Sequence, residues 1–201
     1  MQVPSFSVTL PEGFVELPRE SEPSAERLVE LAQEWQAALG VPNPGELTEG
    51  SLETAAMLAA TGTAAAVAGS THTSAALYRS PEAARPIMVL VNLFTERTDH
   101  EAVSEALELV QKLSTTHSFD RLERVSLPAG ESIVTETSHA GRHESPIGPV
   151  TLTTRSLSAW IPAPHLPETV VIEVSSNNAE DWSHVAGLAK HIFDTFTWEE
   201  E

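Results

Sequence analysis

The sequence predicts an α+β fold in which a largely antiparallel β-sheet is covered by helices. Segments with strand-like alternation follow one another through short turns more often than they alternate with helices, which favours antiparallel pairing. Other stretches carry apolar residues at helical spacing, and the segment 87–94 is apolar on both faces, which is typical of a strand covered from both sides. At 201 residues, we expect a single domain spanning 1–201.

The N-terminal part predicts a hairpin followed by two helices. Apolar and polar residues alternate over 6–17 on either side of a Pro-Glu-Gly turn at 11–13, which predicts two paired strands. Apolar residues at helical spacing predict a helix that is capped by Ser24 and ends at Leu39. A second apolar helix is expected over 51–60, with its first residue, a serine, as the cap.

The remaining elements follow from periodicity and turn residues. The segment 61–78, rich in Ala, Gly, Ser and Thr, predicts the end of a helix followed by a strand. Thr98 and Glu101 form a capping box for a helix over 99–114. Further strands are expected at 121–127, 132–138, 150–161 and 170–174, before a final helix capped by Asn177 or Asn178.

Charge and cysteine content exclude several classes of protein. Twenty-nine acidic against 11 basic residues give a net charge of −18, which repels phosphate backbones and anionic lipids, so we expect neither nucleic acid nor membrane as a partner. Apolar stretches are too short to cross a bilayer, and the first residues do not resemble a signal peptide, so a cytoplasmic location is expected. The absence of cysteine removes disulfides, thiolate nucleophiles and cysteine-based metal sites.

Motifs for catalysis or cofactor binding are not apparent. The ten glycines match neither the phosphate-binding loop of nucleotide hydrolases nor the dinucleotide fingerprint. The run Gly130-Glu131-Ser132-Ile133-Val134 resembles the start of a nucleophile elbow, but a valine replaces its second glycine and a strand is expected where the motif needs a helix. We therefore expect no cofactor. Whether the protein is an enzyme stays open, and the lack of a recognisable catalytic motif favours a protein that is not.

Two histidines suggest a possible metal site. His139 and His143 lie within five residues of each other, so both imidazoles could approach one ion. The neighbouring Gly141 and Pro146 indicate a hairpin tip, and a metal site needs a third or fourth ligand that is held rigidly. The favoured interpretation is a solvated tip with no metal, and the alternative is a metal or pH-responsive contact.

A tryptophan near a proline-rich loop is the candidate contact with a partner. Trp160 precedes Ile161-Pro162-Ala163-Pro164-His165, and tryptophan is enriched where binding energy concentrates in interfaces. Trp160 and His165 are therefore the candidates for contact with a partner protein at a recognition edge. For Trp160 the favoured interpretation is a place in the core, and the partner contact is the alternative.

Two further features leave alternatives open. Small side chains over 62–76 either leave a cavity for a small molecule or permit close packing. The first sixty residues carry ten acidic and two basic side chains, a net charge of −8, which indicates either a solvated face or a docking surface for a basic partner.

Several segments resemble the Mog1/PsbP-like proteins of actinobacteria. The segments are Val8-Thr9-Leu10-Pro11-Glu12-Gly13-Phe14, Ser126-Leu127-Pro128-Ala129-Gly130, Trp160-Ile161-Pro162-Ala163-Pro164 and Ile192-Phe193-Asp194-Thr195-Phe196-Thr197-Trp198. The resemblance implies an α+β sandwich that binds partners without catalysis, in some members near specialised secretion systems. It supplies no functional residue, and this chain lacks the lipoprotein cysteine of the exported members.

Together these observations predict a non-catalytic cytoplasmic protein that binds another protein as an adaptor, chaperone or accessory factor, with a possible link to a specialised secretion system. The alternative is a small-molecule-binding protein or enzyme with a cavity near 62–76. Either a monomer or a homodimer is expected.

Overall fold

The chain divides into two compact units that are described one at a time. The computed structural model describes residues 5–43, 46–83, 85–97, 106–143, 148, 150–164 and 166–199. One unit is Pro11–Phe94, and the other combines Met1–Leu10 with Thr95–Glu201. Helices pack on strands in each unit, and every recorded strand pair is antiparallel. The predicted α+β class is confirmed.

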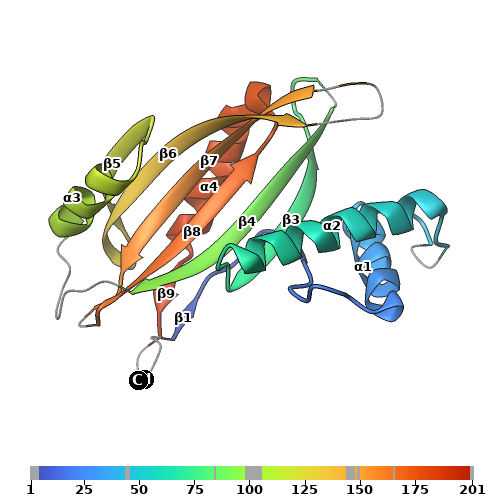
Figure 1. Ribbon diagram of the computed structural model, residues 1–201, viewed down its shortest axis with the longest axis horizontal. Coiled ribbons are helices and arrows are strands. Elements are labelled where there is room, and N and C mark those ends of the chain that lie inside the picture. The colour runs from blue at the N-terminus through green and yellow to red at the C-terminus, as the bar shows by residue number, and fades with distance from the viewer. Residues whose placement is uncertain are drawn as a thin grey trace. The chain divides into compact units, whose positions relative to one another are not determined.

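The Pro11–Phe94 unit contains two helices and a short antiparallel sheet (Figure 1). Its elements are β2 (Val15–Glu16), α1 (Ala25–Ala38), α2 (Glu49–Val67), β3 (His72–Arg79) and the greater part of β4 (Pro86–Arg97). Strand β3 pairs with β2 on one side and with β4 on the other. Helix α1 packs on α2, and α2 packs on β3.

Apolar side chains of both helices form the core of this unit. Leu31 and Trp35 of α1 and Leu58 of α2 are buried together with Val15 of β2 and Ala75 of β3. Burial of such side chains is the main force that holds a helix against a sheet. The stripe of apolar residues predicted for α1 is therefore the face that packs.

Helix α2 is longer at both ends than the sequence predicts. Its cap is Thr48, whose Oγ1 accepts a hydrogen bond from the Ser51 amide (3.2 Å), while Ser51 Oγ accepts one from the Thr48 amide (2.9 Å). These reciprocal bonds form a capping box. The N-cap is therefore Thr48, three residues before the predicted cap Ser51. The helix continues beyond Ala60 to Val67 because the alanine-rich C-terminal part has high helix propensity.

The second unit is built on a four-stranded antiparallel meander with helices against it (Figure 1). Its elements are β1 (Phe6–Ser7), α3 (Ala106–Thr116), β5 (Arg121–Leu127), β6 (Gly130–His143), β7 (Val150–Pro162), β8 (Glu168–Ser176), a 3₁₀ turn η1 (Ala179–Asp181), α4 (Trp182–Asp194) and β9 (Thr197–Trp198). Strands β5 to β8 pair in sequence order. Helix α4 packs on β8 and β7, and α3 packs on β6.

A polar cluster ties α4 to the meander. Glu136 of β6 accepts hydrogen bonds through Oε1 from Arg155 of β7 and from the Trp182 indole of α4, the latter at 2.8 Å. The guanidinium of Arg155 also lies 4.7 Å from the centre of the Trp182 ring, within the range of a cation–π contact. One carboxylate thus connects two strands and the first turn of the helix.

The hairpin predicted for 6–17 is wrong in its pairing. The turn exists, with Gly13 at φ 94°, but β1 pairs with β9 and β2 pairs with β3. Aromatic contacts account for this choice, because the Phe6 ring stacks on Phe196 at 5.2 Å and meets Trp198 edge-on at 6.1 Å. Each of these strands is two residues long, so the local alternation carries little information about its partner.

Other predicted boundaries differ by a few residues. The capping box at Thr98 and Glu101 lies outside the described residues, and the described part of its helix is Ala106–Thr116. The final helix begins with η1, whose N-cap Asn178 makes no side-chain capping bond. The predicted strands at 121–127 and 150–161 are found within one residue of their expected bounds.

No helix in the described ranges has both the length and the apolar character needed to span a membrane.

Candidate binding groove

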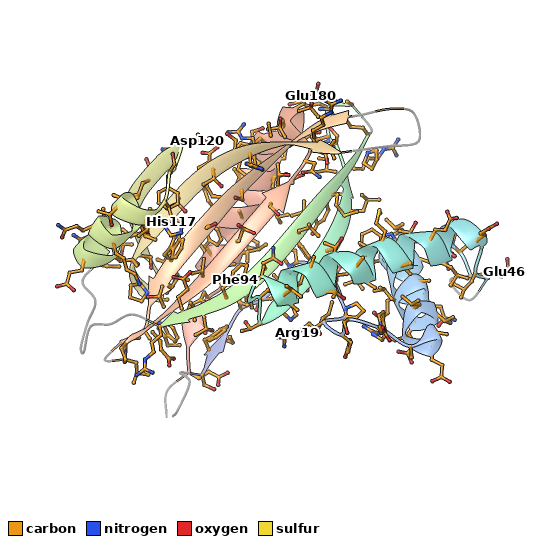
Figure 2. All side chains as sticks on the ribbon, viewed as in Figure 1. Arg19, Glu46, Phe94, His117, Asp120 and Glu180 are labelled. Atoms are coloured by element: carbon orange, nitrogen blue, oxygen red, sulfur yellow. The ribbon has the colours of Figure 1, made fainter. Side chains whose placement is uncertain are left out.

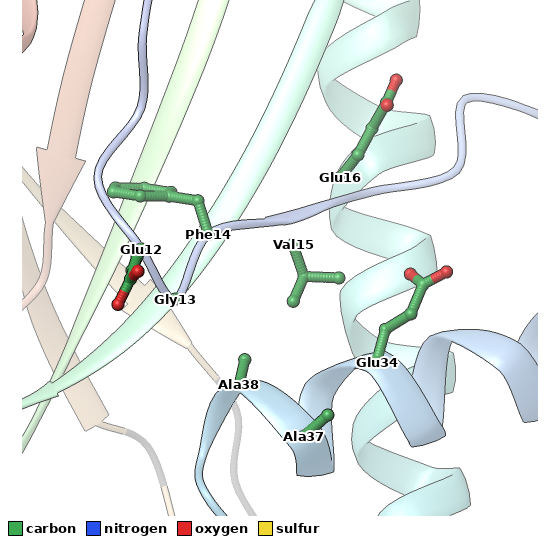
Figure 3. A pocket seen from close by; sticks show the side chains of 8 residues that line it. All are labelled: Glu12, Gly13, Phe14, Val15, Glu16, Glu34, Ala37 and Ala38. Atoms are coloured by element: carbon green, nitrogen blue, oxygen red, sulfur yellow. The ribbon is translucent and has the colours of Figure 1, made fainter.

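An open groove of about 620 Å³ lies within the Pro11–Phe94 unit (Figure 3). It forms between the turn leading into β2 and the C-terminal end of α1. The residues that line it are Glu12, Gly13, Phe14, Val15, Glu16, Glu34, Ala37 and Ala38. Three of these eight carry carboxylates and none is basic, so the groove combines negative charge with apolar surface.

Local sequence determines the shape of the groove wall on the strand side. Gly13 adopts φ 94°, a conformation that glycine reaches without steric cost and that turns the chain into β2. Pairing of Val15 with Ala75 and the bond from the Leu17 amide to the Thr73 carbonyl (2.9 Å) then fix the strand against β3. Val15 is buried, so its side chain anchors this wall to the core.

The helix side of the groove is the last turn of α1. Glu34, Ala37 and Ala38 lie three and four residues apart, which places them on adjacent positions of the helix surface. The two alanines are exposed and their small side chains leave the groove open. Gly40, at φ 68°, follows the helix end in the conformation common after the last helical turn.

The three carboxylates have different surroundings. In Figure 3, Glu16 and Glu34 lie on one side of Val15, and Glu12 lies on the other. Glu34 accepts a hydrogen bond from Arg27 Nη1 at 3.1 Å, and this bond raises the pKa of Arg27 above its ordinary value. Glu16 Oε1 is 3.4 Å from His72 Nδ1, whereas Glu12 has no ion pair within the described part of the chain.

One aromatic pair borders the groove. The ring of Phe14 meets that of Tyr78 edge-on with 6.0 Å between centres, and the Tyr78 hydroxyl donates to the Glu12 carbonyl at 3.3 Å. Burial raises the pKa of Tyr78 above 10.0 because the charged tyrosinate is disfavoured away from water. Tyr78 thus links the strand β3 to two residues of the groove.

Trp160 occupies the environment that the core interpretation predicts. Its side chain is 7% exposed, and its indole N–H donates to Thr135 Oγ1 at 3.0 Å. His117, which follows α3 and is labelled in Figure 2, meets the indole edge-on at 5.9 Å. The structure therefore does not place the Trp160 side chain half-exposed at an open edge, because it is buried against Thr135 and His117. A partner contact at Trp160 stays a prediction.

The other predicted candidates are not brought together. His165 lies outside the described residues. His139 and His143 both belong to β6, His143 as its last residue before the connection to β7, and four residues of extended strand separate their Cα atoms by about 13 Å. His139 is exposed, and the side chain of His143 is outside the described set. Among described residues no group of three or more His, Cys, Asp or Glu side chains is placed to hold a metal ion.

The small residues of 62–76 take no part in lining the groove. A Cβ added to Gly62 would lie 2.3 Å from the Pro18 carbonyl oxygen and 2.8 Å from Leu17 Cβ. Ala75 and Ala76 of β3 are fully buried. At these positions the structure shows close packing, which is the second of the two alternatives for this segment.

Sequence reasoning did not identify the groove residues. Glu12, Phe14, Glu16 and Glu34 were visible only as members of an acidic N-terminal region whose docking role was one of two interpretations. The three glutamates share only the acidic character of the first sixty residues, and Phe14 carries no such signal. Which of the ten acidic residues meet at one surface depends on how β2 packs beside α1.

The fold and groove together define a small α+β protein with an open acidic groove that has apolar walls. Scans of protein-family models and of curated proteins found no match to the chain. Among solved structures, the chain is similar to LpqN of Mycobacterium tuberculosis, a protein described as involved in cell envelope biogenesis. The similarity has a TM-score of 0.42 at 10% identity and covers 98% of this chain and 85% of LpqN.

Proposed function

We propose that the protein is a non-catalytic adaptor, chaperone or accessory factor of the cytoplasm, and that it binds a partner protein through the groove. The observation that supports the proposal is the open groove of about 620 Å³ with three glutamates and an apolar wall. The partner presents a short segment in which arginine or lysine side chains alternate with apolar ones.

Charge favours a basic segment over other occupants. The lining contributes three carboxylates and no cation, and the whole chain carries −18, so the field around the groove attracts positive and repels negative ligands. Glu34 is partly neutralised by Arg27, whereas Glu12 has no ion pair in the described part of the chain. Glu12 is therefore the carboxylate most ready to receive a cationic side chain.

Apolar side chains of the same segment find a surface beside the carboxylates. Phe14 is partly exposed, and Ala37 and Ala38 are exposed on the last turn of α1. Contact with these residues removes apolar area from water, which stabilises the complex by about 25 cal/mol for each Å² of apolar area buried. Such contacts distinguish a groove for a peptide from a surface that attracts any cation.

Calorimetric titration with two matched peptides tests the proposal. A capped peptide of alternating leucine and arginine is expected to bind, and its affinity is expected to fall as salt is raised. A peptide of alternating leucine and glutamate is the control and is expected not to bind. Equal binding of both peptides, or binding of neither, contradicts the proposal.

Single substitutions assign the binding to the groove. Glu12→Gln and Glu34→Gln are each expected to weaken binding of the arginine peptide roughly two- to fivefold, the range of an exposed ion pair. Glu30→Gln is the matched control, because Glu30 lies one turn from Glu34 on α1, also contacts Arg27 (3.4 Å), and does not line the groove. If Glu30→Gln weakens binding as much as the other two, the attraction is general and not local to the groove.

A further inference from the structure

Strand β2 has an open edge beside the groove. Among the described residues, β3 is the one strand that pairs with β2, so the other edge of β2 has no strand partner there. An unpaired strand edge presents backbone N–H and C=O groups that can receive an additional strand. Residues 12–16 line the groove and no residue of β3 does, so the groove lies on the side of β2 that faces away from β3.

The hydrogen bonds between β2 and β3 show which backbone groups face the open edge. The Leu17 amide donates to the Thr73 carbonyl at 2.9 Å, so the N–H of Leu17 points toward β3. In an antiparallel pair the hydrogen-bonding groups of successive residues point to opposite edges. Val15 therefore also faces β3, whereas the N–H and C=O groups of Phe14 and Glu16 face the open edge. In the described ranges, the backbone of neither residue bonds to another part of the chain.

We propose that the partner segment binds in an extended conformation and adds a strand to the open edge of β2, with backbone hydrogen bonds to Phe14 and Glu16. This inference rests on the proposed function, because it specifies how the groove holds the segment. In this mode of recognition the backbone hydrogen bonds supply affinity, and alternate side chains supply specificity. The occupant is thus an extended stretch of polypeptide with alternating basic and apolar side chains.

The two faces of β2 match this alternation. Successive side chains of a strand point to opposite faces of the sheet. In Figure 3 the Val15 side chain points to the side of the strand where Ala37 and Ala38 of α1 lie, and Glu16 points the opposite way. An added strand would place every second side chain against the alanines and the others beside the Glu16 carboxylate. Apolar side chains suit the first face, and arginine or lysine suits the second.

The open edge is short, and this limits what can pair with it. Pro18 occupies the next position that would face the edge after Glu16, and proline has no backbone N–H to donate. Phe14 and Glu16 therefore offer two donors and two acceptors, at positions about 7 Å apart along the strand. Short edge strands also protect proteins from pairing sheet to sheet. The edge thus suits one short extended segment.

A helical segment is a poorer occupant of this edge than an extended one. A helix uses its backbone N–H and C=O groups for its own hydrogen bonds, so it cannot bond to the free groups of Phe14 and Glu16. Its side chains also share a face every three or four residues, whereas the two faces of β2 call for a period of two. The three carboxylates of the lining favour positive side chains in either case, so the backbone of β2 is what selects the extended form.

Amide hydrogen exchange of the whole protein tests the added strand, with the leucine–arginine peptide as the probe. Saturating peptide is expected to slow exchange of the Phe14 and Glu16 amides by about tenfold or more, because hydrogen-bonded amides exchange only when the bond opens. The Gly13 amide is the control, because Gly13 lines the groove but lies outside β2. If the peptide binds but these two amides exchange as before, or no more slowly than Gly13, the strand pairing is overturned and the proposed function stands. If the peptide does not bind, both fail.

A matched pair of variants separates the backbone bond from the charge. Glu16→Gln and Glu16→Pro both remove the carboxylate, and only proline removes the N–H. Because this N–H faces away from β3, proline there breaks no bond of the sheet, and Val15 before it is already extended. Glu16→Pro is expected to bind the peptide about two- to tenfold more weakly than Glu16→Gln, the effect of one backbone hydrogen bond. Equal affinities of the two folded variants contradict the added strand. If thermal unfolding shows that Glu16→Pro does not fold, the exchange measurement on the wild type decides.

Discussion

Gly62 illustrates what a single small residue does in this protein. The small side chains of 62–76 predict either room for a ligand or close packing, and in the structure Gly62 allows α2 to lie against the backbone of Leu17 and Pro18. The sequence does not choose between these alternatives, because the neighbour that matters is 44 residues away at Pro18. The same holds for Trp160, whose partner Thr135 is remote in the chain.

Replacing Gly62 by alanine is expected to destabilise the protein by about 1–3 kcal/mol, because the added Cβ would meet the Pro18 carbonyl oxygen at 2.3 Å and backbone must move. Gly187→Ala is the control within α4, where the added Cβ meets nothing within 4 Å. Alanine there should stabilise by about 0.5–1 kcal/mol through helix propensity. Urea unfolding of both variants checks the pair, and equal effects would contradict close packing at Gly62.

Tyr78 gives a pH-dependent signal that belongs to one residue, since it is the single tyrosine of the chain. Burial raises its pKa in the folded protein above 10.0, so tyrosinate absorbance should appear at higher pH in the folded than in the urea-unfolded chain. Below pH 10 both states keep the proton and stability is unaffected. Above it the unfolded state loses the proton first, so the free energy of unfolding falls as pH rises through the folded pKa. Identical midpoints in the two states would contradict the burial of Tyr78.

At the scale of elements, long periodic segments were predictable and short strands were not. The apolar stripe of α1 and the alternation of β5 and β7 contain enough residues to specify type and approximate bounds. Strands β1 and β2 contain two residues each, and their partners are chosen by contacts with Phe196, Trp198 and Ala75, which are distant in the chain. For such short strands the pairing is determined by tertiary contacts and not by the local sequence.

The start of α2 depends on its capping box. Thr48→Ala removes the side-chain acceptor for the Ser51 amide and is expected to lower the free energy of unfolding by about 1 kcal/mol. Thr54→Ala is the control, because the Thr54 hydroxyl only donates to the Gly50 carbonyl within the helix and alanine is the better helix former. Thermal unfolding compares the two variants. A loss for Thr54→Ala as large as that for Thr48→Ala would show that the cap is not what fixes the helix start.

At the scale of the molecule, net charge was the one property related to the proposed binding that could be predicted from the sequence. The excess of acid over base in the first sixty residues indicated either a solvated face or a docking surface, and the structure brings Glu12, Glu16 and Glu34 to one groove with apolar walls. Composition could not select these three, because residues 12–16 and 34–38 lie on separate elements whose proximity depends on the packing of α1 and β2 in this unit.

Amide chemical-shift mapping of the labelled protein with the leucine–arginine peptide tests the groove most directly. The proposed function predicts that shifts concentrate at the amides of residues 12–16 and 34–38 and diminish as salt is added. Shifts spread evenly over acidic surfaces, or gathered on strands β5 to β8 with the groove unchanged, would contradict it.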